Sequence, residues 1–218
     1  MVIFDCNGVL VDGEPIAHAV AAQAFTRAGI PMTPELVARF FAGRRPADMV
    51  AAVEQASGRR LPANVSATIA NETLRRFRLE LRPTPHAAYA LTWLRGPKCV
   101  ASSSPYDRIR VSLETTGLLR FFEPSLFSAS DVIRGKPAPD LFLRAAARTG
   151  VQPSDCIVVE DSPAGVTAAT AAGMTAIGFV GGRHAGADLG PMLLAAGACT
   201  VIADMRKLKS TVIDIRGW

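Results

Sequence analysis

Short runs of apolar residues recur along the chain, and each is followed by a polar or glycine-containing stretch. Five of them have the length of a buried β-strand: VIF (2–4), KCVAS (98–102), SLFS (125–128), CIVVE (156–160) and MTAIGFV (174–180). Segments with helical signals separate the later runs, at 105–116, 139–149 and 163–172. Each segment begins at a proline and ends just before a glycine, the usual asymmetry of helix ends. Strands alternating with such helices predict an α/β fold in which a parallel sheet has helices on both faces.

The interval between the first and the second apolar run has a different pattern. It contains helical stretches but no convincing strand, and it is broken at Gly29-Ile30-Pro31, Gly43, Gly58 and Pro83-Thr84-Pro85. We therefore expect a helical domain inserted after the first strand. The predicted domains are a core of residues 1–13 and 84–218 and an inserted helical domain of residues 14–83.

The composition is that of a globular protein. Hydrophobic residues make up 49% and charged residues 20% of the chain, which excludes disordered, collagen-like and coiled-coil proteins. The net charge of +5 is compatible with an anionic ligand, but the arginines are scattered. Their densest group, LRRFRLELR (74–82), belongs to a helical repeat that would bury Ala70, Leu74, Phe77 and Leu81. We interpret these arginines as a solvated helix face and predict no nucleic-acid partner.

The cysteines and the N-terminal sequence indicate the cellular compartment. Cys6, Cys99, Cys156 and Cys199 lie in or beside apolar runs and lack the spacing of a metal or redox motif. We therefore expect buried thiols in a reducing cytoplasm. The chain has neither a basic N-terminal region followed by a long apolar segment nor a run of about 18 apolar residues, so we predict no signal peptide and no membrane partner.

Polar residues gather where the predicted strands end. Asp5 ends the first strand, Ser102-Ser103-Ser104 the second and Glu160-Asp161-Ser162 the fourth, and Lys136 lies in the loop after the third. The carboxyl ends of parallel strands form the edge at which ligands bind in open α/β sheets. Taken singly, these residues are also typical of turns, helix caps and solvated loops. Their joint occurrence at strand ends favours one common site.

The chemistry of this set suits Mg²⁺ and a phosphate group. Mg²⁺ takes one or two carboxylates from a protein, here Asp5 and Asp161, and completes its shell with water and substrate oxygens. A carboxylate beside the cation can attack phosphorus and form an aspartyl-phosphate. Lys136 and the hydroxyl and N–H groups at Ser102 can hold the transferred phosphoryl group and neutralise its charge.

Four motifs in this order resemble the haloacid dehalogenase superfamily, in its phosphatase and β-phosphoglucomutase-like branch. They are FDCNGVLVD (4–12), the serines after CVA (99–101), GKPAPD (135–140) and VVEDSPAG (158–165), and together they cover nearly the whole chain. The resemblance implies a Rossmann-like core and a helical cap inserted after the first motif, in agreement with the helical interval described above.

The resemblance also implies roles for individual residues. Asp5 is similar to the nucleophile of the family, and Ser102 to the hydroxyl that holds the phosphoryl group. Lys136 matches the lysine of the third motif. The neighbouring Ser103 and Ser104 become candidates for substrate binding.

A metal site is implied by the first and fourth motifs. Asp5 and Asp161 match carboxylate ligands of Mg²⁺, with Glu160 beside them as a further candidate. The main-chain carbonyl of Asn7 is the remaining expected ligand, because in such proteins residue 7 coordinates through its backbone.

The side chain of Asn7 departs from the family pattern. Related phosphatases have an aspartate there, which protonates the leaving oxygen and later activates the attacking water. An amide has no titrating proton near neutral pH, so we expect a loss of about 10²–10⁴ in rate. Three origins remain open: an engineered substitution, a naturally divergent enzyme, or partial deamidation of the Asn7-Gly8 pair. Gly13, where relatives often have Ser or Thr, is a second departure and favours natural divergence.

Some candidates lie in the predicted cap. Arg44 and Arg45 belong to the loop FAGRRPAD (41–48), and a guanidinium there would pair with a phosphate or carboxylate of the substrate. Glu14 is either a partner for a substrate hydroxyl or an ordinary carboxylate of a first helical turn. The three histidines, His18, His86 and His184, are scattered, and we interpret them as surface or structurally satisfied side chains.

The predicted function is a Mg²⁺-dependent phosphatase of small phosphate monoesters, such as phosphosugars or sugar-acid phosphates, acting as a monomer or homodimer. One alternative is a phosphosugar mutase on the same core. The other is a non-catalytic protein that binds a phosphorylated ligand, which Asn7 favours and the retained Asp5 disfavours. A dehalogenase is disfavoured because Lys136, Ser102 and two adjacent acids suit a phosphate and a metal.

Overall fold

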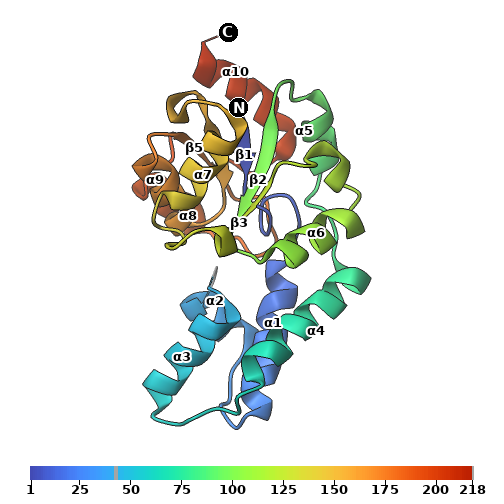
Figure 1. The fold of residues 1–218 in the computed structure, drawn as a ribbon, viewed down its shortest axis with the longest axis vertical. Coiled ribbons are helices and arrows are strands. Elements are labelled where there is room, and N and C mark those ends of the chain that lie inside the picture. Colours follow the sequence, from blue (N-terminus) through green and yellow to red (C-terminus); the bar gives the residue numbers. More distant parts are fainter. Residues whose placement is uncertain (42–43, 218) are drawn as a thin grey trace. The chain divides into compact units, whose positions relative to one another are not determined.

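The computed structural model describes residues 1–41 and 44–217. The chain divides into two compact units, a core unit of residues 1–12 and 82–218 and a helical unit of residues 13–81 (Figure 1). The sequence-based boundaries, after residues 13 and 83, differ from these by one and two residues. Gly43, one of the predicted helix breaks, lies outside the described residues.

A six-stranded parallel sheet with the order β3-β2-β1-β4-β5-β6 forms the centre of the core unit. Its strands are β1 (Val2–Phe4), β2 (Lys98–Ser102), β3 (Leu126–Ser128), β4 (Ile157–Glu160), β5 (Thr175–Phe179) and β6 (Thr200–Ile202). The chain moves from β1 outwards to β2 and β3, and then crosses to β4 on the other side. The predicted Rossmann-like α/β class is therefore confirmed, with the change of direction at β1, where such sheets bind ligands.

Helices cover both faces of this sheet. Figure 1 shows α7, α8 and α9 on one face and α5, α6 and α10 on the other. Their bounds are α5 (Ala87–Trp93), α6 (Tyr106–Thr115), α7 (Asp140–Thr149), α8 (Pro163–Ala171), α9 (Leu189–Ala195) and α10 (Leu208–Arg216). The three helices predicted from Pro and Gly are α6, α7 and α8. At the end of α7, Gly150 has a φ of 70°, a left-handed conformation that glycine adopts without strain.

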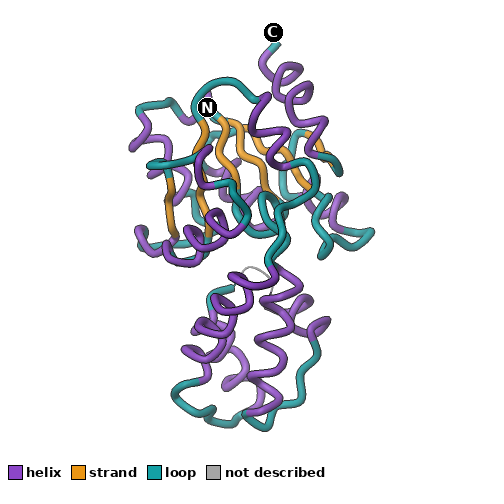
Figure 2. The backbone as a smooth tube through the Cα atoms, turned by 90° about the vertical axis from the view of Figure 1, so that its right-hand side faces the viewer, coloured by secondary structure: helices purple, strands orange, loops and turns teal. Residues whose placement is uncertain are grey.

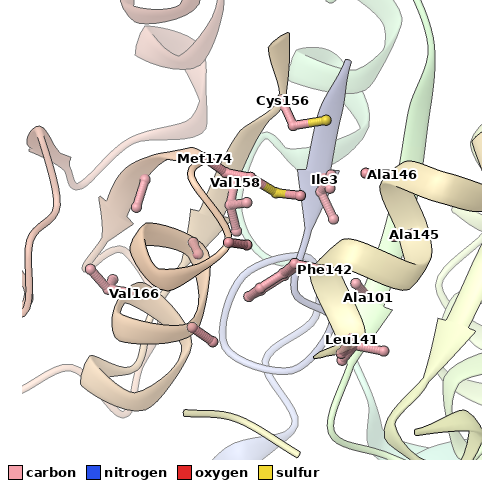
Figure 3. Close-up of a cluster of buried hydrophobic side chains, with 14 of the residues drawn as sticks. Ile3, Ala101, Leu141, Phe142, Ala145, Ala146, Cys156, Val158, Val166 and Met174 are labelled. Atoms are coloured by element: carbon pink, nitrogen blue, oxygen red, sulfur yellow. The ribbon is translucent and has the colours of Figure 1, made fainter. Parts of the chain in front are cut away.

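The core between α7 and the sheet is continuous with the polar edge of the sheet. Phe142 of α7 is fully buried and belongs to one hydrophobic cluster with Ile3 of β1 and Val158 of β4 (Figure 3). Burial of such a ring stabilises the fold by about 1.5–3 kcal/mol. The centre of the same ring lies 5.0 Å from Nζ of Lys136, so the apolar core ends directly at a charged group.

The helical unit contains helices and loops in its described part (Figure 2). Its helices are α1 (Glu14–Arg27), α2 (Pro34–Phe41), α3 (Pro46–Ser57) and α4 (Val65–Glu80). They enclose a small core of their own, in which Phe25 of α1 and Ile69 of α4 are buried.

Helix α4 corrects one detail of the sequence analysis. Its buried positions are Val65, Ile69, Thr73 and Phe77, whereas Ala70, predicted to be buried, is exposed and Leu74 is half-buried. Ile69 and Thr73 are thus buried one residue before the predicted Ala70 and Leu74, whereas Phe77 and Leu81 are buried as predicted. Arg75 pairs with Glu72 and Arg76 with Glu80 along the outer surface of this helix, as expected for a solvated face.

Two further expectations need correction. The sequence analysis missed β6, which has only three residues. It also predicted four buried cysteines, but Cys199, next to β6, is exposed, while the other three are buried. Among the described residues, no helix is both long enough and apolar enough to cross a membrane.

Candidate active site

The carboxylate of Asp5 lies where β1 meets its two neighbours. Phe4, the last residue of β1, pairs in register with Val100 of β2 and Val159 of β4. The N–H of Asp5 continues this pairing, because it donates a hydrogen bond of 3.0 Å to the carbonyl of Val159. The side chain therefore emerges at the carboxyl edge of the sheet, between the ends of β2 and β4, and is 9% exposed.

The chain turns back sharply after Asp5. N–H groups of Leu10 and Val11 donate to the carbonyl of Cys6 at 2.9 and 3.0 Å, and the N–H of Gly8 donates to the carbonyl of Val11 at 2.7 Å. Gly8 has a φ of 87°, which side chains rarely allow. A Cβ atom at this position would also lie 1.8 Å from Oδ2 of Asp161. Glycine is thus required here both by the turn and by the close approach of Asp161.

Lys136 contacts the ends of three neighbouring strands, β1, β2 and β4, at this edge. Its Nζ donates hydrogen bonds to Oδ1 of Asp5 at 2.6 Å, to Oε1 of Glu160 at 2.5 Å and to the carbonyl of Ala101 at 3.1 Å. The Lys136 side chain is 5% exposed. Its three donors are therefore directed at partners from β4, β2 and the end of β1, and the ammonium group has a fixed position.

Glu160 is held from both sides. Oε1 of Glu160 accepts a hydrogen bond from Lys136. Oε2 accepts two from Ser162, one from its Oγ at 2.9 Å and one from its backbone N–H at 3.2 Å. Oγ of Ser162 in turn accepts from the N–H of Gly165 and caps α8. A Cβ atom at Gly165 would lie 2.0 Å from the Glu160 carboxylate, so this glycine makes room for it. The network directs Glu160 towards Lys136.

Asp161 has a partner that the sequence analysis missed. Nε2 of His184 lies 2.8 Å from Oδ2 of Asp161, and the two side chains are 16% and 9% exposed. The interpretation of His184 as one of three unremarkable histidines is incomplete, because the structure brings it to the same sheet edge as Asp5. One signal in the sequence could have identified it. His184 lies in the loop after β5, and this loop begins at the carboxyl edge of the sheet.

Ser104, two residues after the end of β2, contacts the side chain of Asn7. Nδ2 of Asn7 donates a hydrogen bond of 3.0 Å to Oγ of Ser104, and Oγ of Ser128 donates one of 2.8 Å to the carbonyl of Ser104. Oγ of Ser102 accepts from the N–H of Ser104. Ser102 and Ser104 are buried, whereas Ser103 is half-buried. Oδ1 of Asn7 is buried without a hydrogen-bond partner among the described residues.

The electrostatics of the site depend on the position of Lys136. Burial raises the pKa of Asp5; Lys136 acts in the opposite direction, and Glu160 and Asp161 raise the pKa further. Burial lowers the pKa of Lys136, but the two adjacent carboxylates outweigh this effect and the pKa is raised overall. The lysine therefore remains an ammonium ion and compensates the buried negative charge.

The oxygen donors at this edge fit Mg²⁺. Asp5 and Asp161 are close enough to affect each other's charge, and Asp161 lies against the loop that contains Asn7 and Gly8. The described part of the chain has no group of three or more His, Cys, Asp or Glu side chains arranged around one metal position. Mg²⁺ usually binds through one or two carboxylates together with carbonyl, water and phosphate oxygens.

The remaining candidates belong to the helical unit and have partners within it. Glu14 lies 3.0 Å from Nε2 of His18, one helical turn away. Both Arg44 and Arg45 are exposed. Nε and Nη2 of Arg45 donate to the two oxygens of Asp48, and the guanidinium of Arg44 lies 5.9 Å from the ring centre of Phe41. Each of these residues thus has a contact inside the helical unit itself.

Comparison with known proteins gives a consistent result. The chain is 33% identical over 184 residues to 6-phosphogluconate phosphatase from Escherichia coli, covering 84% of this chain and 83% of that protein. A solved structure of a haloacid dehalogenase-like protein from Agrobacterium tumefaciens has a TM-score of 0.87 and 36% identity, over 99% and 98% of the two chains. Another, a HAD family hydrolase from Deinococcus radiodurans with bound phosphate and sodium, has a TM-score of 0.79 and 28% identity, over 98% and 94%.

A family model provides the most direct assignment. Residues 1–173, which contain all four motifs, match the model of haloacid dehalogenase-like hydrolases. The sheet order, the polar edge and the sequence motifs agree with this match. The chain belongs to the haloacid dehalogenase-like hydrolase family.

Proposed function

We propose that the protein is a Mg²⁺-dependent phosphatase of small phosphate monoesters that reacts through an aspartyl-phosphate on Asp5. The observation that carries the proposal is the position of Lys136, whose Nζ bridges Asp5 and Glu160 at the carboxyl edge of the sheet. An ammonium group fixed beside a buried carboxylate keeps that carboxylate in one orientation and neutralises charge when a phosphoryl group approaches.

The proposed reaction has two steps on one residue. A carboxylate oxygen of Asp5 forms a bond to phosphorus while the bond from phosphorus to the ester oxygen of the substrate breaks, and the leaving oxygen takes up a proton. Water then forms a bond to phosphorus and the bond to Asp5 breaks, which releases inorganic phosphate. Ser102 and the neighbouring serines would hold the phosphoryl oxygens, and Lys136 would compensate their charge.

The proposed metal ligands are Asp5, Asp161 and the main-chain carbonyl of Asn7. A bound Mg²⁺ would neutralise charge on the phosphoryl oxygens and on Asp5. Glu160 fits a different role better, because both of its oxygens already accept hydrogen bonds from Lys136 and Ser162. We therefore propose that Glu160 positions Lys136.

Asn7 should limit both steps. Its amide has no proton to give to the leaving oxygen, and it cannot take one from the attacking water. In the structure Nδ2 is directed at Oγ of Ser104. The loss should be about 10²–10⁴ in rate, the usual contribution of general acid–base catalysis.

The proposed substrates are phosphosugars or sugar-acid phosphates. This choice rests on the similarity to a 6-phosphogluconate phosphatase, and the structure with bound phosphate is compatible with it. Arg44, Arg45 and Glu14 remain proposed substrate contacts. A reducing cytoplasm, where free cysteines persist, is the proposed location, and the proposed assembly is a monomer or homodimer.

The test is phosphate release from a panel of sugar phosphates and sugar-acid phosphates, with and without Mg²⁺. The chain itself, the Asn7→Asp variant and an Asp5→Asn control are compared. We expect slow release by the chain, release faster by about 10²–10⁴ in Asn7→Asp, and none in Asp5→Asn. Equal rates in the chain and in Asn7→Asp, or activity in Asp5→Asn, would rule out the proposed roles.

A second candidate, a binding protein for a phosphorylated ligand, is favoured by the amide of Asn7. It predicts that Asn7→Asp binds sugar phosphates by calorimetry but releases no phosphate. The same samples, followed by ³¹P NMR, distinguish a mutase, because a mutase moves the phosphate to another hydroxyl of the sugar without releasing it.

A further inference from the structure

The loop after β5 contributes a side chain to the proposed metal site for which the proposed reaction has no use. His184 lies in this loop, five residues beyond Phe179, the last residue of β5. Its Nε2 is 2.8 Å from Oδ2 of Asp161. The other proposed carboxylate ligand, Asp5, accepts a hydrogen bond from Lys136, whereas His184 and Asp161 are in close contact without hydrogen-bond geometry.

The loop is fixed in place by a second acid–base pair. The N–H of Arg183 donates to Oδ1 of Asp12 at 3.2 Å, and its Nε donates to Oδ2 of the same carboxylate. Asp12 is 4% exposed. The adjacent residues Arg183 and His184 thus contact two acids, Asp12 and Asp161, that follow different strands, so that the backbone before His184 is anchored independently of its ring.

Two glycines form the space that the imidazole occupies. A Cβ atom at Gly8 would lie 2.8 Å from Cε1 of His184, and one at Gly182 would lie 2.7 Å from Cε1 and Nδ1. The Cβ position at Gly182 is also 2.9 Å from the carbonyl oxygen of Gly8. The two glycine-containing loops therefore approach each other closely, with the ring against both and Nε2 within 2.8 Å of Oδ2 of Asp161.

We propose that His184 is a positioning residue for Asp161: it holds Oδ2 through Nε2 and leaves the other carboxylate oxygen for a divalent cation. The inference rests on the proposed function, because it takes Asp161 as a ligand of Mg²⁺. Carboxylates that bind metals are usually held by hydrogen bonds from a second layer of residues, and loss of such a partner costs about 10–100-fold in metal affinity. In the opposite role, the ring of His184 would occupy the position of the cation and compete with Mg²⁺ for Asp161.

The test measures Mg²⁺ binding by calorimetry on the metal-free protein. His184→Gln keeps an N–H donor, and His184→Ala removes it. We expect His184→Ala to bind Mg²⁺ about 10–100-fold more weakly and His184→Gln to lie between it and the parent chain. His86→Asn is the matched control, since His86 is exposed and has a φ of 64°, which asparagine tolerates. Its affinity should equal that of the parent.

Chemical rescue separates positioning from simple damage to the fold. Imidazole added to His184→Ala should restore part of the Mg²⁺ affinity, because a free ring can enter the space between Gly8 and Gly182. In the more active Asn7→Asp background, His184→Ala should raise the KM for Mg²⁺ and leave kcat at saturating Mg²⁺ nearly unchanged. Unchanged or tighter Mg²⁺ binding by His184→Ala, or lower affinity that imidazole does not restore, would overturn the proposal.

Asp161→Asn and Asp5→Asn show which hypothesis has failed. If both lose Mg²⁺ binding while His184→Ala retains it, the role of His184 is wrong and the proposed metal site stands. If Asp161→Asn and Asp5→Asn bind Mg²⁺ as the parent does, the metal site of the proposed function is wrong, and the role of His184 falls with it.

Discussion

Nζ of Lys136 lies 2.6 Å from Oδ1 of Asp5, although 131 positions separate the two residues along the chain. The same Nζ contacts Glu160, so a single ammonium group compensates two buried carboxylates. Burying charges is costly unless they are paired, and removal of one partner leaves the others uncompensated. The relationship is therefore part of the fold as well as of the proposed chemistry.

Replacement of Lys136 by methionine should strongly destabilise the protein. We expect a loss of about 3–5 kcal/mol in the free energy of unfolding, because Asp5 and Glu160 would remain buried without their cation. Urea denaturation at neutral pH measures this loss. Lys207→Met, at an exposed lysine, is the control and should change the stability little. The double variant Lys136→Met with Glu160→Gln should lose less than Lys136→Met alone, since one buried charge fewer lacks a partner; an equal or larger loss would contradict the role of Lys136.

Two glycines near helix N-termini should differ in their response to alanine. At Gly165 in α8 the new methyl group would meet the Glu160 carboxylate, so we expect Gly165→Ala to lose about 1–3 kcal/mol of stability and to lower activity. At Gly190 in α9 the nearest atom, of Val201, is 3.9 Å from the Cβ position. Gly190→Ala should therefore change the stability by less than about 0.5 kcal/mol, because the methyl group fits but Pro191 offsets the higher helix propensity of alanine. Similar unfolding free energies for the two variants would show that the space around Glu160 is not restrictive.

The cysteines should differ in reactivity with a thiol reagent. Burial raises the pKa of Cys99 to about 12 and that of Cys6 further, so these buried thiols should stay unreactive in the folded protein. Cys199 is exposed, and we expect one reactive thiol per folded chain and four after unfolding. Partial desolvation also raises the pKa of Cys199, so its rate should keep increasing as the pH rises past 9, where the thiolate fraction grows. Cys199→Ser should abolish the reaction of the folded protein; a reaction that persists would contradict the burial of the other three.

The strand ends were predictable because local signals mark them. Apolar runs followed by polar residues located five strands, and the strand-end rule placed Asp5, Glu160 and Lys136 at one edge of the sheet. Neither the partner of each side chain nor the shared Nζ follows from such signals. They depend on register, in which Phe4 faces Val159, and on a loop that returns Lys136 to β1.

Other features escaped prediction for physical reasons. β6 has three residues, only one of them buried, so no strong apolar run marks it. Thr73 has a polar side chain but is buried, so the pattern of apolar residues did not predict its position on the buried face of α4. His184 approaches Asp161 from a loop in which Arg183 contacts Asp12, 171 positions away, and contacts across such a separation are not visible in a local pattern.

The central claim is that Asp5 becomes phosphorylated and that Asn7 slows both formation and hydrolysis of this intermediate. p-Nitrophenyl phosphate separates the two steps, because p-nitrophenolate leaves without needing a proton, whereas hydrolysis of the phosphoaspartate still lacks its general base. The decisive measurement is rapid-mixing release of p-nitrophenolate, with mass spectrometry of the acid-quenched protein. We predict a burst of about one equivalent per chain, a phosphoryl group on Asp5 and slow turnover afterwards, with faster turnover in Asn7→Asp. No burst, no modified Asp5 and the same slow turnover in both proteins would contradict it.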